Sequence, residues 1–451
     1  MSLSLDPFFA PRSIAVVGAS NTEGKMGNRF IRHLAGYGGR VYPVHPSETE
    51  IEGHGAFPTL ADLPEDVDLL IALVPAALLL AVLSECPAGR ARFLLAIPSG
   101  FAETAGDGPA LQRELVAEAN SRGIRVVGPN SVGMLNVPAR LNASMVPEPP
   151  DGGHGLSCLT QSGGFAMATW MYAHNHGLHI NKICDLGNTS DVDVADALGH
   201  LRDDEQTEVV GLFLESSRDP AGFTAQLAEL AAAKPVVIAR MGASDAGRRA
   251  SEAHVGGSWR QHDPLPPGVV AVDTGLDVLH AAKALAWQPP PAGRRVGILT
   301  GSGGVGAELS DLCVRSGLEV PDLSPELRTA LASHLPDYAG LGNPVDTTPI
   351  WWEYARLYPP LISALLDSDE VDMVIATVID VASEIPELAE ALAAGEAQWR
   401  AHGAGKPVYV YFGAPDRALA NRHTIEQAGI PCYASTTDLV RIVAAVAEGR
   451  G

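Results

Sequence analysis

The residues best suited to chemistry in this sequence begin with a glycine-rich turn near the N-terminus. The apolar run Ile14–Val17 leads directly into Gly18-Ala-Ser20-Asn21-Thr-Glu-Gly-Lys25-Met-Gly27. In a parallel α/β sheet, a turn after the first strand lies at the carboxyl edge, where backbone N–H groups and the next helix N-terminus can bind phosphate. Gly18 and Gly27 would let the backbone approach a ligand, and Lys25 could add a positive charge. This pattern predicts a site for a phosphate-bearing nucleotide, with a purely structural turn as the alternative.

The spacing of this turn disfavours a dinucleotide such as NAD. The glycines do not follow the GxGxxG pattern, and the second strand ends in Tyr42-Pro-Val-His45-Pro-Ser47, without the Asp or Glu that holds a ribose 2′-hydroxyl. A nucleotide that has phosphates but no second ribose diol fits better, and CoA is such a ligand. An NAD-dependent oxidoreductase stays open as an alternative.

A second kind of turn occurs twice, as Leu159-Thr-Gln-Ser162-Gly-Gly164 and as Leu299-Thr-Gly-Ser302-Gly-Gly304. Each follows an apolar run and precedes a helix-period segment, so it can present backbone donors at a helix N-terminus. A hydrolase nucleophile at Ser162 is disfavoured because a nucleophile elbow requires Gly at position 160, which is Thr. In the later copy, Gly301-Ser-Gly303-Gly-Val-Gly306 spells GxGxxG, and close packing of helix on strand is the preferred interpretation.

Other residues that could bind a metal or form a disulfide give weaker signals. His174, His176 and His179 are close in sequence, but the surrounding pattern predicts a solvated helix end. The five cysteines are scattered, without CxxC spacing, so neither a zinc site nor a disulfide framework is indicated. We expect no metal site on this chain.

The elements that must position these turns follow from alternating apolar runs and helix-period segments. Pro/Gly-rich stretches at 146–153 and 287–293 divide the chain. In the first part we expect strands at 14–17, 41–44, 69–74, 93–97 and 124–127, separated by helices, which indicates parallel βαβ units. The predicted fold is α/β, with three Rossmann-like or flavodoxin-like doubly wound domains and mostly parallel sheets. Their expected bounds are 1–148, 149–290 and 291–451.

Composition narrows the class of protein further. The 451 residues carry a formal net charge of −22, which argues against binding nucleic acid through its phosphates. No signal peptide is visible at the N-terminus, and the longest apolar run contains Pro75 and is too short to span a membrane. We therefore expect a cytoplasmic enzyme with no membrane partner.

Motifs along the whole chain resemble one known family. They include SIAVVGAS…GKMGN, Val74-Pro75, Ile97-Pro-Ser99-Gly100-Phe-Ala-Glu and Gly128-Pro-Asn130, followed by Gln161-Ser-Gly-Gly164, the stretch 186–193, FLE ending at Glu215, Ser251-Glu-Ala-His254-Val-Gly-Gly257 and Gly342-Asn-Pro-Val-Asp346. In this order they resemble the alpha subunit of NDP-forming acyl-CoA synthetases, and the first two segments resemble the alpha subunit of succinate–CoA ligase.

The resemblance implies a role for individual residues. His254 would take up phosphate as a phosphohistidine on a mobile glycine-rich hairpin, and Glu215 would be its acidic partner. Phosphate would be held at Ser162, Gly163, Gly164, Gly256 and Gly257. The residues implied to bind CoA are Gly18, Ser20, Asn21, Lys25, Gly27, Val74, Pro75, Ser99, Gly100 and Asn130. The sequence departs from the family pattern at Ser47, Ser131 and Val255, which leaves the affinity for CoA and the class of acyl substrate open.

The same resemblance implies the reaction and a partner. Acyl-CoA, phosphate and ADP (or GDP) would interconvert with carboxylate, CoA and ATP (or GTP) through an acyl phosphate. The nucleotide, with Mg²⁺, would bind an ATP-grasp module, and no such segment is visible in these 451 residues. We therefore expect a separate ATP-grasp beta subunit in a hetero-oligomer. A CoA-binding regulatory or scaffold protein that has lost catalysis is the remaining alternative.

Overall fold

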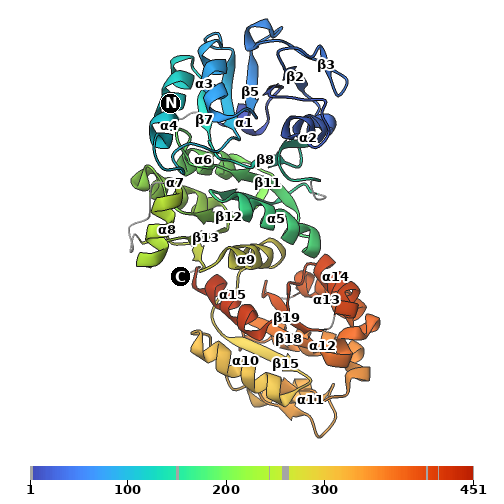
Figure 1. The fold of residues 1–451 in the computed structure, drawn as a ribbon. Coiled ribbons are helices and arrows are strands. Elements are labelled where there is room, and N and C mark those ends of the chain that lie inside the picture. Colours follow the sequence, from blue (N-terminus) through green and yellow to red (C-terminus); the bar gives the residue numbers. More distant parts are fainter. Residues whose placement is uncertain are drawn as a thin grey trace. The chain divides into compact units, whose positions relative to one another are not determined.

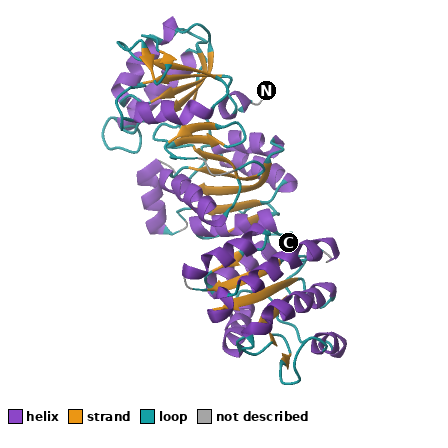
Figure 2. Ribbon diagram, turned by 90° about the vertical axis from the view of Figure 1, so that its right-hand side faces the viewer, coloured by secondary structure: helices purple, strands orange, loops and turns teal. Residues whose placement is uncertain are grey.

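The computed structural model describes residues 4–148, 152–242, 244–255, 264–402, 405–414 and 416–449. The chain divides into two compact units (Figure 1). The first comprises residues 1–269 and 273–278, and the second comprises residues 270–272 and 279–451. Each unit is built from βα repeats, in which short buried strands alternate with helices (Figure 2).

The first sheet of the first unit contains five parallel strands in the order β2-β1-β5-β6-β7. Its strands are β1 (Ser13–Val17), β2 (Arg40–Val44), β5 (Val67–Ala72), β6 (Ala91–Ala96) and β7 (Arg125–Val127). The helices are α1 (Asp6–Phe9), α2 (Met26–His33), α3 (Ala76–Ser84) and α4 (Gly108–Ser121), with a small hairpin of β3 (Glu50–Ile51) and β4 (His54–Gly55). Strands β1 and β5 are buried at every position, as expected for strands covered on both faces. All five expected strands are confirmed within about two residues.

The second sheet has seven strands in the order β14-β13-β12-β10-β11-β8-β9. Its strands are β8 (Gly133–Asn136), β9 (Leu141–Ser144), β10 (Gly155–Thr160), β11 (Ile180–Asp185), β12 (Thr207–Leu214), β13 (Val236–Arg240) and β14 (Val269–Ala271). The helices that follow these strands are α5 (Gly163–His176), α6 (Val194–Asp203), α7 (Pro220–Ala233) and α8 (Asp245–Val255). Helix α9 (Gly275–Trp287) begins in the first unit and continues into the second. Strands β10 to β13 are parallel, while β8 lies antiparallel to β11 and to β9. The antiparallel pair β8–β9 thus extends the parallel strands β10 to β13.

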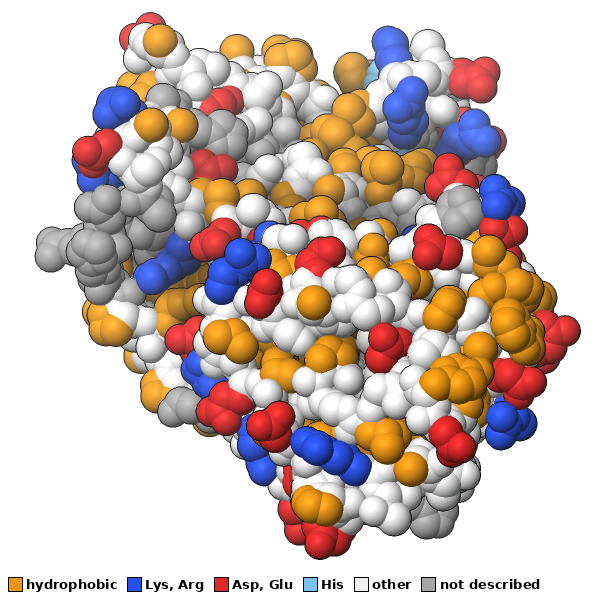
Figure 3. All heavy atoms as spheres, turned by 90° about the horizontal axis from the view of Figure 1, so that it is seen from below, with side chains coloured by type: hydrophobic (Ala, Val, Ile, Leu, Met, Phe, Trp, Pro, Cys, Tyr) orange, Lys and Arg blue, Asp and Glu red, His pale blue; other side chains and the backbone are white. Residues whose placement is uncertain are grey.

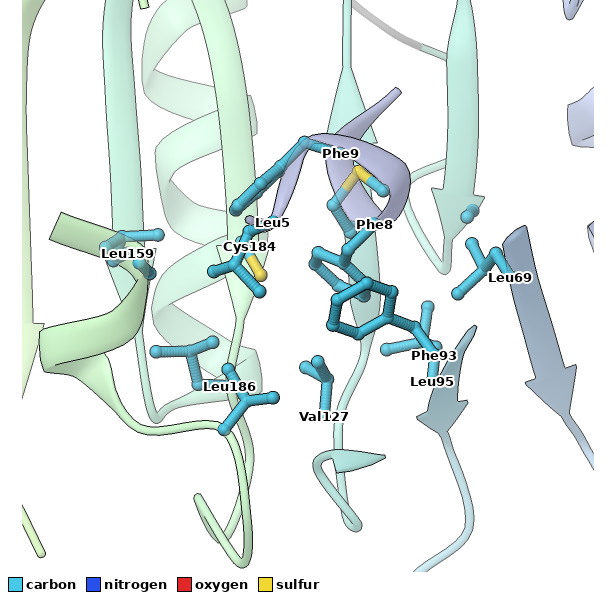
Figure 4. Packing of buried hydrophobic residues seen from close by; sticks show 14 of the residues in the cluster. Leu5, Phe8, Phe9, Leu69, Phe93, Leu95, Val127, Leu159, Cys184 and Leu186 are labelled. Carbon is cyan, nitrogen blue, oxygen red and sulfur yellow. The ribbon is translucent and has the colours of Figure 1, made fainter. Parts of the chain in front are cut away.

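The two sheets of the first unit share one hydrophobic core. The short helix α1 contributes Phe8 and Phe9, both almost fully buried, to a cluster that contains Phe93 from β6 and Leu159 from β10 (Figure 4). The Phe8 and Phe93 rings lie 5.8 Å apart, and Phe9 stacks on His200 at 4.4 Å between ring centroids. The N-terminal helix therefore packs against elements of both sheets.

The second unit contains a six-stranded sheet in the order β16-β17-β15-β18-β19-β20, parallel except for β16 against β17. Its strands are β15 (Val296–Thr300), β16 (Gly340–Leu341), β17 (Val345–Asp346), β18 (Met373–Ile379), β19 (Val408–Gly413) and β20 (Cys432–Tyr433). Its helices are α10 (Gly303–Arg315), α11 (Pro325–Ala332), α12 (Tyr354–Asp367), α13 (Pro386–His402), α14 (Leu419–Gln427) and α15 (Thr436–Glu448). Short 3-10 turns at η1 (Leu34–Gly36), η2 (Leu60–Asp62), η3 (Trp351–Glu353), η4 (Asp380–Glu384) and η5 (Asp416–Ala418) complete the elements.

These sheets confirm the predicted α/β class with mostly parallel strands. The three domain bounds stay a prediction, because the compact units number two and the first of them holds two sheets. On the face drawn in Figure 3, Lys and Arg side chains are interspersed with Asp and Glu rather than gathered together. Among the helices that the structure describes, none is long and apolar enough to cross a membrane.

Candidate active site

The turn after β1 shows why glycine is needed at its two ends. Gly18 has a φ of +87°, and a Cβ built on it would lie 2.9 Å from Cγ1 of Val74. A Cβ on Gly27 would lie 2.0 Å from the carbonyl oxygen of Gly18. The turn therefore folds back on itself and against the β5–α3 loop, which leaves a backbone-lined surface at the sheet edge. This surface fits a phosphate-bearing ligand that approaches the backbone closely.

Two of the predicted CoA-binding side chains brace this turn. The Ser20 hydroxyl accepts a hydrogen bond from the Thr22 N–H at 3.0 Å. The Asn21 amide donates to the Glu50 carbonyl at 2.8 Å and accepts from the Glu52 N–H at 3.1 Å. Both side chains thereby help to hold the backbone of the turn in place. Lys25, at the start of α2, is exposed.

The remaining predicted CoA-binding residues lie at the carboxyl ends of neighbouring strands. Val74 and Pro75 follow β5, Ser99 and Gly100 follow β6, and Asn130 follows β7. Gly100 and Asn130 have positive φ values of 103° and 61°, and the Asn130 N–H donates to the Pro98 carbonyl at 3.0 Å. The fold thus brings these residues to one edge of the first sheet, which is where a ligand binds in such sheets. Their contact with CoA stays a prediction.

The turn between β10 and α5 is built as a helix N-terminus. Ser162 is the N-cap residue, and its hydroxyl accepts a hydrogen bond from the Phe165 N–H at 3.4 Å. A Cβ on Gly163 would lie 2.5 Å from Cγ1 of Val132, whereas a Cβ on Gly164 would meet nothing closer than 3.9 Å. Gly163 is therefore required by packing, and Gly164 faces open space. The arrangement fits an anion held by backbone N–H groups at the positive end of a 14-residue helix.

Gln161 connects this turn to Glu215, and it was absent from the predicted site. Its side-chain oxygen accepts from the N–H groups of Glu215 at 2.7 Å and Ser216 at 3.0 Å, and its amide donates to Thr189 at 3.2 Å. Gln161 and Glu215 are 3% and 8% exposed. The structure therefore brings Glu215 to the Ser162–Gly164 turn. One feature of the sequence could have singled out Gln161. The repeated turns at 159–164 and 299–304 differ at one position, where the first has Gln161 and the second has Gly301.

His254 is described only by its backbone. It lies in the last turn of α8, which begins shortly after β13 at the carboxyl edge of the second sheet. The expected hairpin is wrong for this residue, because the chain is helical up to Val255. Gly256 and Gly257 lie outside the described residues. The roles of His254, Gly256 and Gly257 stay predictions.

Loops of the two sheets in the first unit are joined by close contacts beside these turns. The Asp185 carboxylate accepts from the Val132 N–H at 2.7 Å, and the Ser131 hydroxyl donates to the Asp185 carbonyl at 2.5 Å. A Cβ on Gly187 would lie 2.2 Å from the carbonyl oxygen of Pro129. The loop that carries the predicted CoA-binding Asn130 therefore packs tightly on the loop that follows β11.

The repeated turn in the second unit is tightly packed, as expected from its glycines. A Cβ on Gly301 would lie 1.7 Å from the hydroxyl oxygen of Tyr354, and a Cβ on Gly306 would lie 3.0 Å from Cγ2 of Thr300. The turn borders a cavity of about 510 Å³ that Asp346 and Trp351 also line. At the end of α5, His174 and His176 each stack on an aromatic ring. Within the described ranges there is no group of three or more metal-ligating side chains.

Three family models match successive parts of the chain. A CoA binding domain matches residues 12–136, a succinyl-CoA ligase like flavodoxin domain matches residues 153–285, and a ligase-CoA domain matches residues 296–448. The alpha subunit of ADP-forming acetate–CoA ligase II from Pyrococcus furiosus is 31% identical, over 98% of this chain and 97% of that protein. The ADP-forming acetate–CoA ligase I of Archaeoglobus fulgidus is 32% identical over 82% of this chain, but the matched region is 54% of that longer protein.

A solved structure supports the same relationship. Acetyl-coenzyme A synthetase 1 of Ca. Korarchaeum cryptofilum, in complex with phosphate and ADP, superimposes with a TM-score of 0.87 and 27% identity, covering 99% of this chain and 97% of that one. The sequence-based resemblance and the predicted fold class are thereby confirmed. By its motifs, its sheets and these relatives, the chain belongs to the family of ADP-forming acetate–CoA ligase alpha subunits.

Proposed function

We propose that this chain is the CoA-binding, phosphohistidine-carrying subunit of an NDP-forming acyl-CoA ligase. The observation that carries the proposal is the Gln161 amide, which ties the buried Glu215 to the Ser162–Gly164 turn. A backbone anion site and a carboxylate at one sheet edge are what a transferring phosphoryl group and an oriented imidazole require. The named relatives support the ligase activity, and the CoA binding domain model supports CoA as a substrate.

The proposed sequence has three reversible steps. Phosphate attacks the thioester carbon, the carbon–sulfur bond breaks, and acyl phosphate and CoA thiolate form. An imidazole nitrogen of His254 then attacks phosphorus, the phosphorus–oxygen bond to the acyl group breaks, and the carboxylate leaves. Phosphohistidine finally passes the phosphoryl group to ADP or GDP. In these steps the N–H groups of Gly163 and Gly164 hold the phosphoryl oxygens, and Glu215 orients the imidazole through its other nitrogen.

The last step requires a nucleotide site, and we assign it to a partner chain. The Archaeoglobus relative is a single chain of which this sequence matches about half, whereas the Pyrococcus relative is named an alpha subunit. We propose a separate ATP-grasp beta subunit that binds the nucleotide with Mg²⁺ in a hetero-oligomer. Co-purification of this chain with a tagged ATP-grasp candidate tests this assignment, and CoA-dependent ADP formation by the pair should exceed that of either chain alone.

The central test follows phosphorus onto the protein. Incubation with acetyl phosphate labelled with ³²P should give an acid-labile label on the wild-type chain. The label should be lost in His254→Ala and kept in His174→Ala, which changes an exposed histidine on α5. Equal labelling of wild type and His254→Ala would refute the proposed carrier. A labelled His254 also discriminates against the scaffold alternative, which predicts CoA binding without any phosphorylation.

A melting experiment discriminates the oxidoreductase alternative. A ligand that binds the native state raises the melting temperature according to its concentration and affinity. We expect CoA to raise the melting temperature and NAD(H) to leave it unchanged. The reverse pattern would support the oxidoreductase and contradict the proposed function.

A further inference from the structure

Asn188 lies in the loop between β11 and α6 of the second sheet, yet its side chain contacts loops of the first sheet. Its amide nitrogen donates to the Glu103 carboxylate at 2.6 Å and to the Gln112 side chain at 2.9 Å. Its amide oxygen accepts from the Asn130 side chain at 3.3 Å, and its backbone N–H donates to the Pro129 carbonyl at 2.9 Å. Asn188 is 5% exposed, so these hydrogen bonds form out of water.

Glu103 is the residue through which Asn188 reaches the predicted CoA loop. The second carboxylate oxygen of Glu103 accepts from the N–H groups of Gly100 at 2.5 Å and Phe101 at 3.1 Å. One carboxylate therefore holds the turn that contains Ser99 and Gly100, and also receives the amide of Asn188. Gly100 has a φ of +103°, and the hydrogen bonds fix this unusual backbone conformation.

The charge state of Glu103 agrees with this geometry. Burial alone would raise the pKa of the Glu103 carboxyl, but the hydrogen bonds from Asn188 and from the backbone of Gly100 and Phe101 outweigh burial and lower that pKa. The carboxylate is therefore ionised at neutral pH, and its hydrogen bonds are of the stronger, charge-assisted kind.

We infer that Asn188 is a positioning residue that fixes the CoA loop at 99–100 to the sheet that carries the phosphate turn. This inference rests on the proposed function, because it names the residue that fixes the position of the predicted CoA loop relative to the phosphate turn. Asn188 acts through the Glu103 carboxylate, which accepts its amide and the Gly100 N–H. A displacement of the loop by about 1 Å is enough to weaken binding and slow a transfer between two bound groups.

The hydrogen bond between Asn188 and Glu103 can be reversed in direction by exchanging the amide and the carboxylate between the two positions. In Asn188→Asp, two carboxylates face each other at hydrogen-bond distance. In Glu103→Gln, two amide donors face each other. In the double variant, the amide introduced at position 103 donates to the new carboxylate at position 188, and its oxygen still accepts from the Gly100 and Phe101 N–H groups. The double variant thus restores the hydrogen bond between positions 103 and 188, while the hydrogen bond from position 188 to Gln112 stays lost.

The test measures the dissociation constant for CoA by calorimetry on the full-length chain. A hydrogen bond to a charged group contributes about 1.5–3 kcal/mol, so each single variant should raise the dissociation constant roughly tenfold or more. The double variant should return to within about threefold of wild type. Asn181→Ala is the matched control, because this fully buried amide also donates to a carboxylate, that of Asp204 at 2.7 Å, away from the CoA loop. It should lower the melting temperature and leave the CoA dissociation constant unchanged.

The outcomes separate the inference from the function on which it rests. If the wild-type chain binds no CoA, the proposed function is overturned and the inference with it. If the wild-type chain binds CoA and Asn188→Asp binds it equally well, only the inference is overturned. A double variant that stays as weak as the single variants would also overturn it, because a merely structural loss is not repaired by reversing the hydrogen bond.

Discussion

Gln161 offers the sharpest test of how the phosphate turn is held. Gln161→Ala removes the oxygen that accepts from the N–H groups of Glu215 and Ser216, at 2.7 and 3.0 Å. Both residues are less than 10% exposed, so their N–H groups would lose their bonds to this oxygen in a buried region. Leaving a buried donor unpaired costs about 1–3 kcal/mol. We expect the free energy of unfolding of the first unit to fall by roughly 2–4 kcal/mol, since water can reach part of the vacated space.

Calorimetric unfolding is the appropriate assay, because the two units can unfold in separate transitions. Gln161→Glu is the matched variant, since it keeps the accepting oxygen and the size of the side chain. It keeps the Glu215 and Ser216 N–H groups paired, so any remaining loss of stability reports the cost of placing a charge at this buried position. The Gln161→Glu chain should still take up little phosphate label from acetyl phosphate, because a new negative charge would lie beside the bound anion. A Gln161→Ala chain with wild-type stability and labelling would refute the role given to this amide.

Three further perturbations test other parts of the fold. Lys283→Met should lower the free energy of unfolding of the second unit by about 3–5 kcal/mol, because it removes the cation 2.7 Å from the buried Glu426 carboxylate. Adding Glu426→Gln should restore most of that loss in denaturant titrations. Gly301→Ala should cost about 1–3 kcal/mol, since its Cβ would lie 1.7 Å from the Tyr354 hydroxyl oxygen, and a lower melting temperature reports it. Burial lowers the pKa of His200, so the stability contributed by the neutral ring is complete above the ordinary histidine pKa of about 6.5 and is lost as the pH falls below it. The stability advantage of wild type over His200→Gln should therefore shrink from pH 7.5 to pH 5.

Each of these variants has a control in the same chain. Arg441→Ala removes an exposed ion pair with Asp438 and should change stability by less than about 1 kcal/mol. Gly304→Ala adds a Cβ that meets nothing closer than 4.0 Å and should leave the second unit as stable as before. His174→Gln changes an exposed histidine and should change the free energy of unfolding at pH 7.5 by less than about 1 kcal/mol. A large loss in any control would contradict the packing argument for its partner variant.

The sequence by itself determined the strands of the first sheet, the glycine-rich turns and the class of fold. Runs such as Ile14–Val17 are apolar at every position, and this local pattern dictates a strand covered on both faces. The turn at Gly18 and the turn at Ser162–Gly164 are equally local, because the chain must leave a strand and enter a helix within a few residues. Motifs in family order then indicated the function class, which the relatives confirm.

Only the tertiary structure decided which polar side chains connect these parts. Gln161 reaches Glu215 across 54 residues, and Asn188 reaches Glu103 across 85 residues. The strands β8 and β9 likewise join the second sheet in an antiparallel arrangement, although they follow the first sheet in the sequence. An amide can donate or accept in many settings, so its sequence neighbours do not reveal its partner. That choice is made by the packing of loops that come together only when the two sheets fold onto one core.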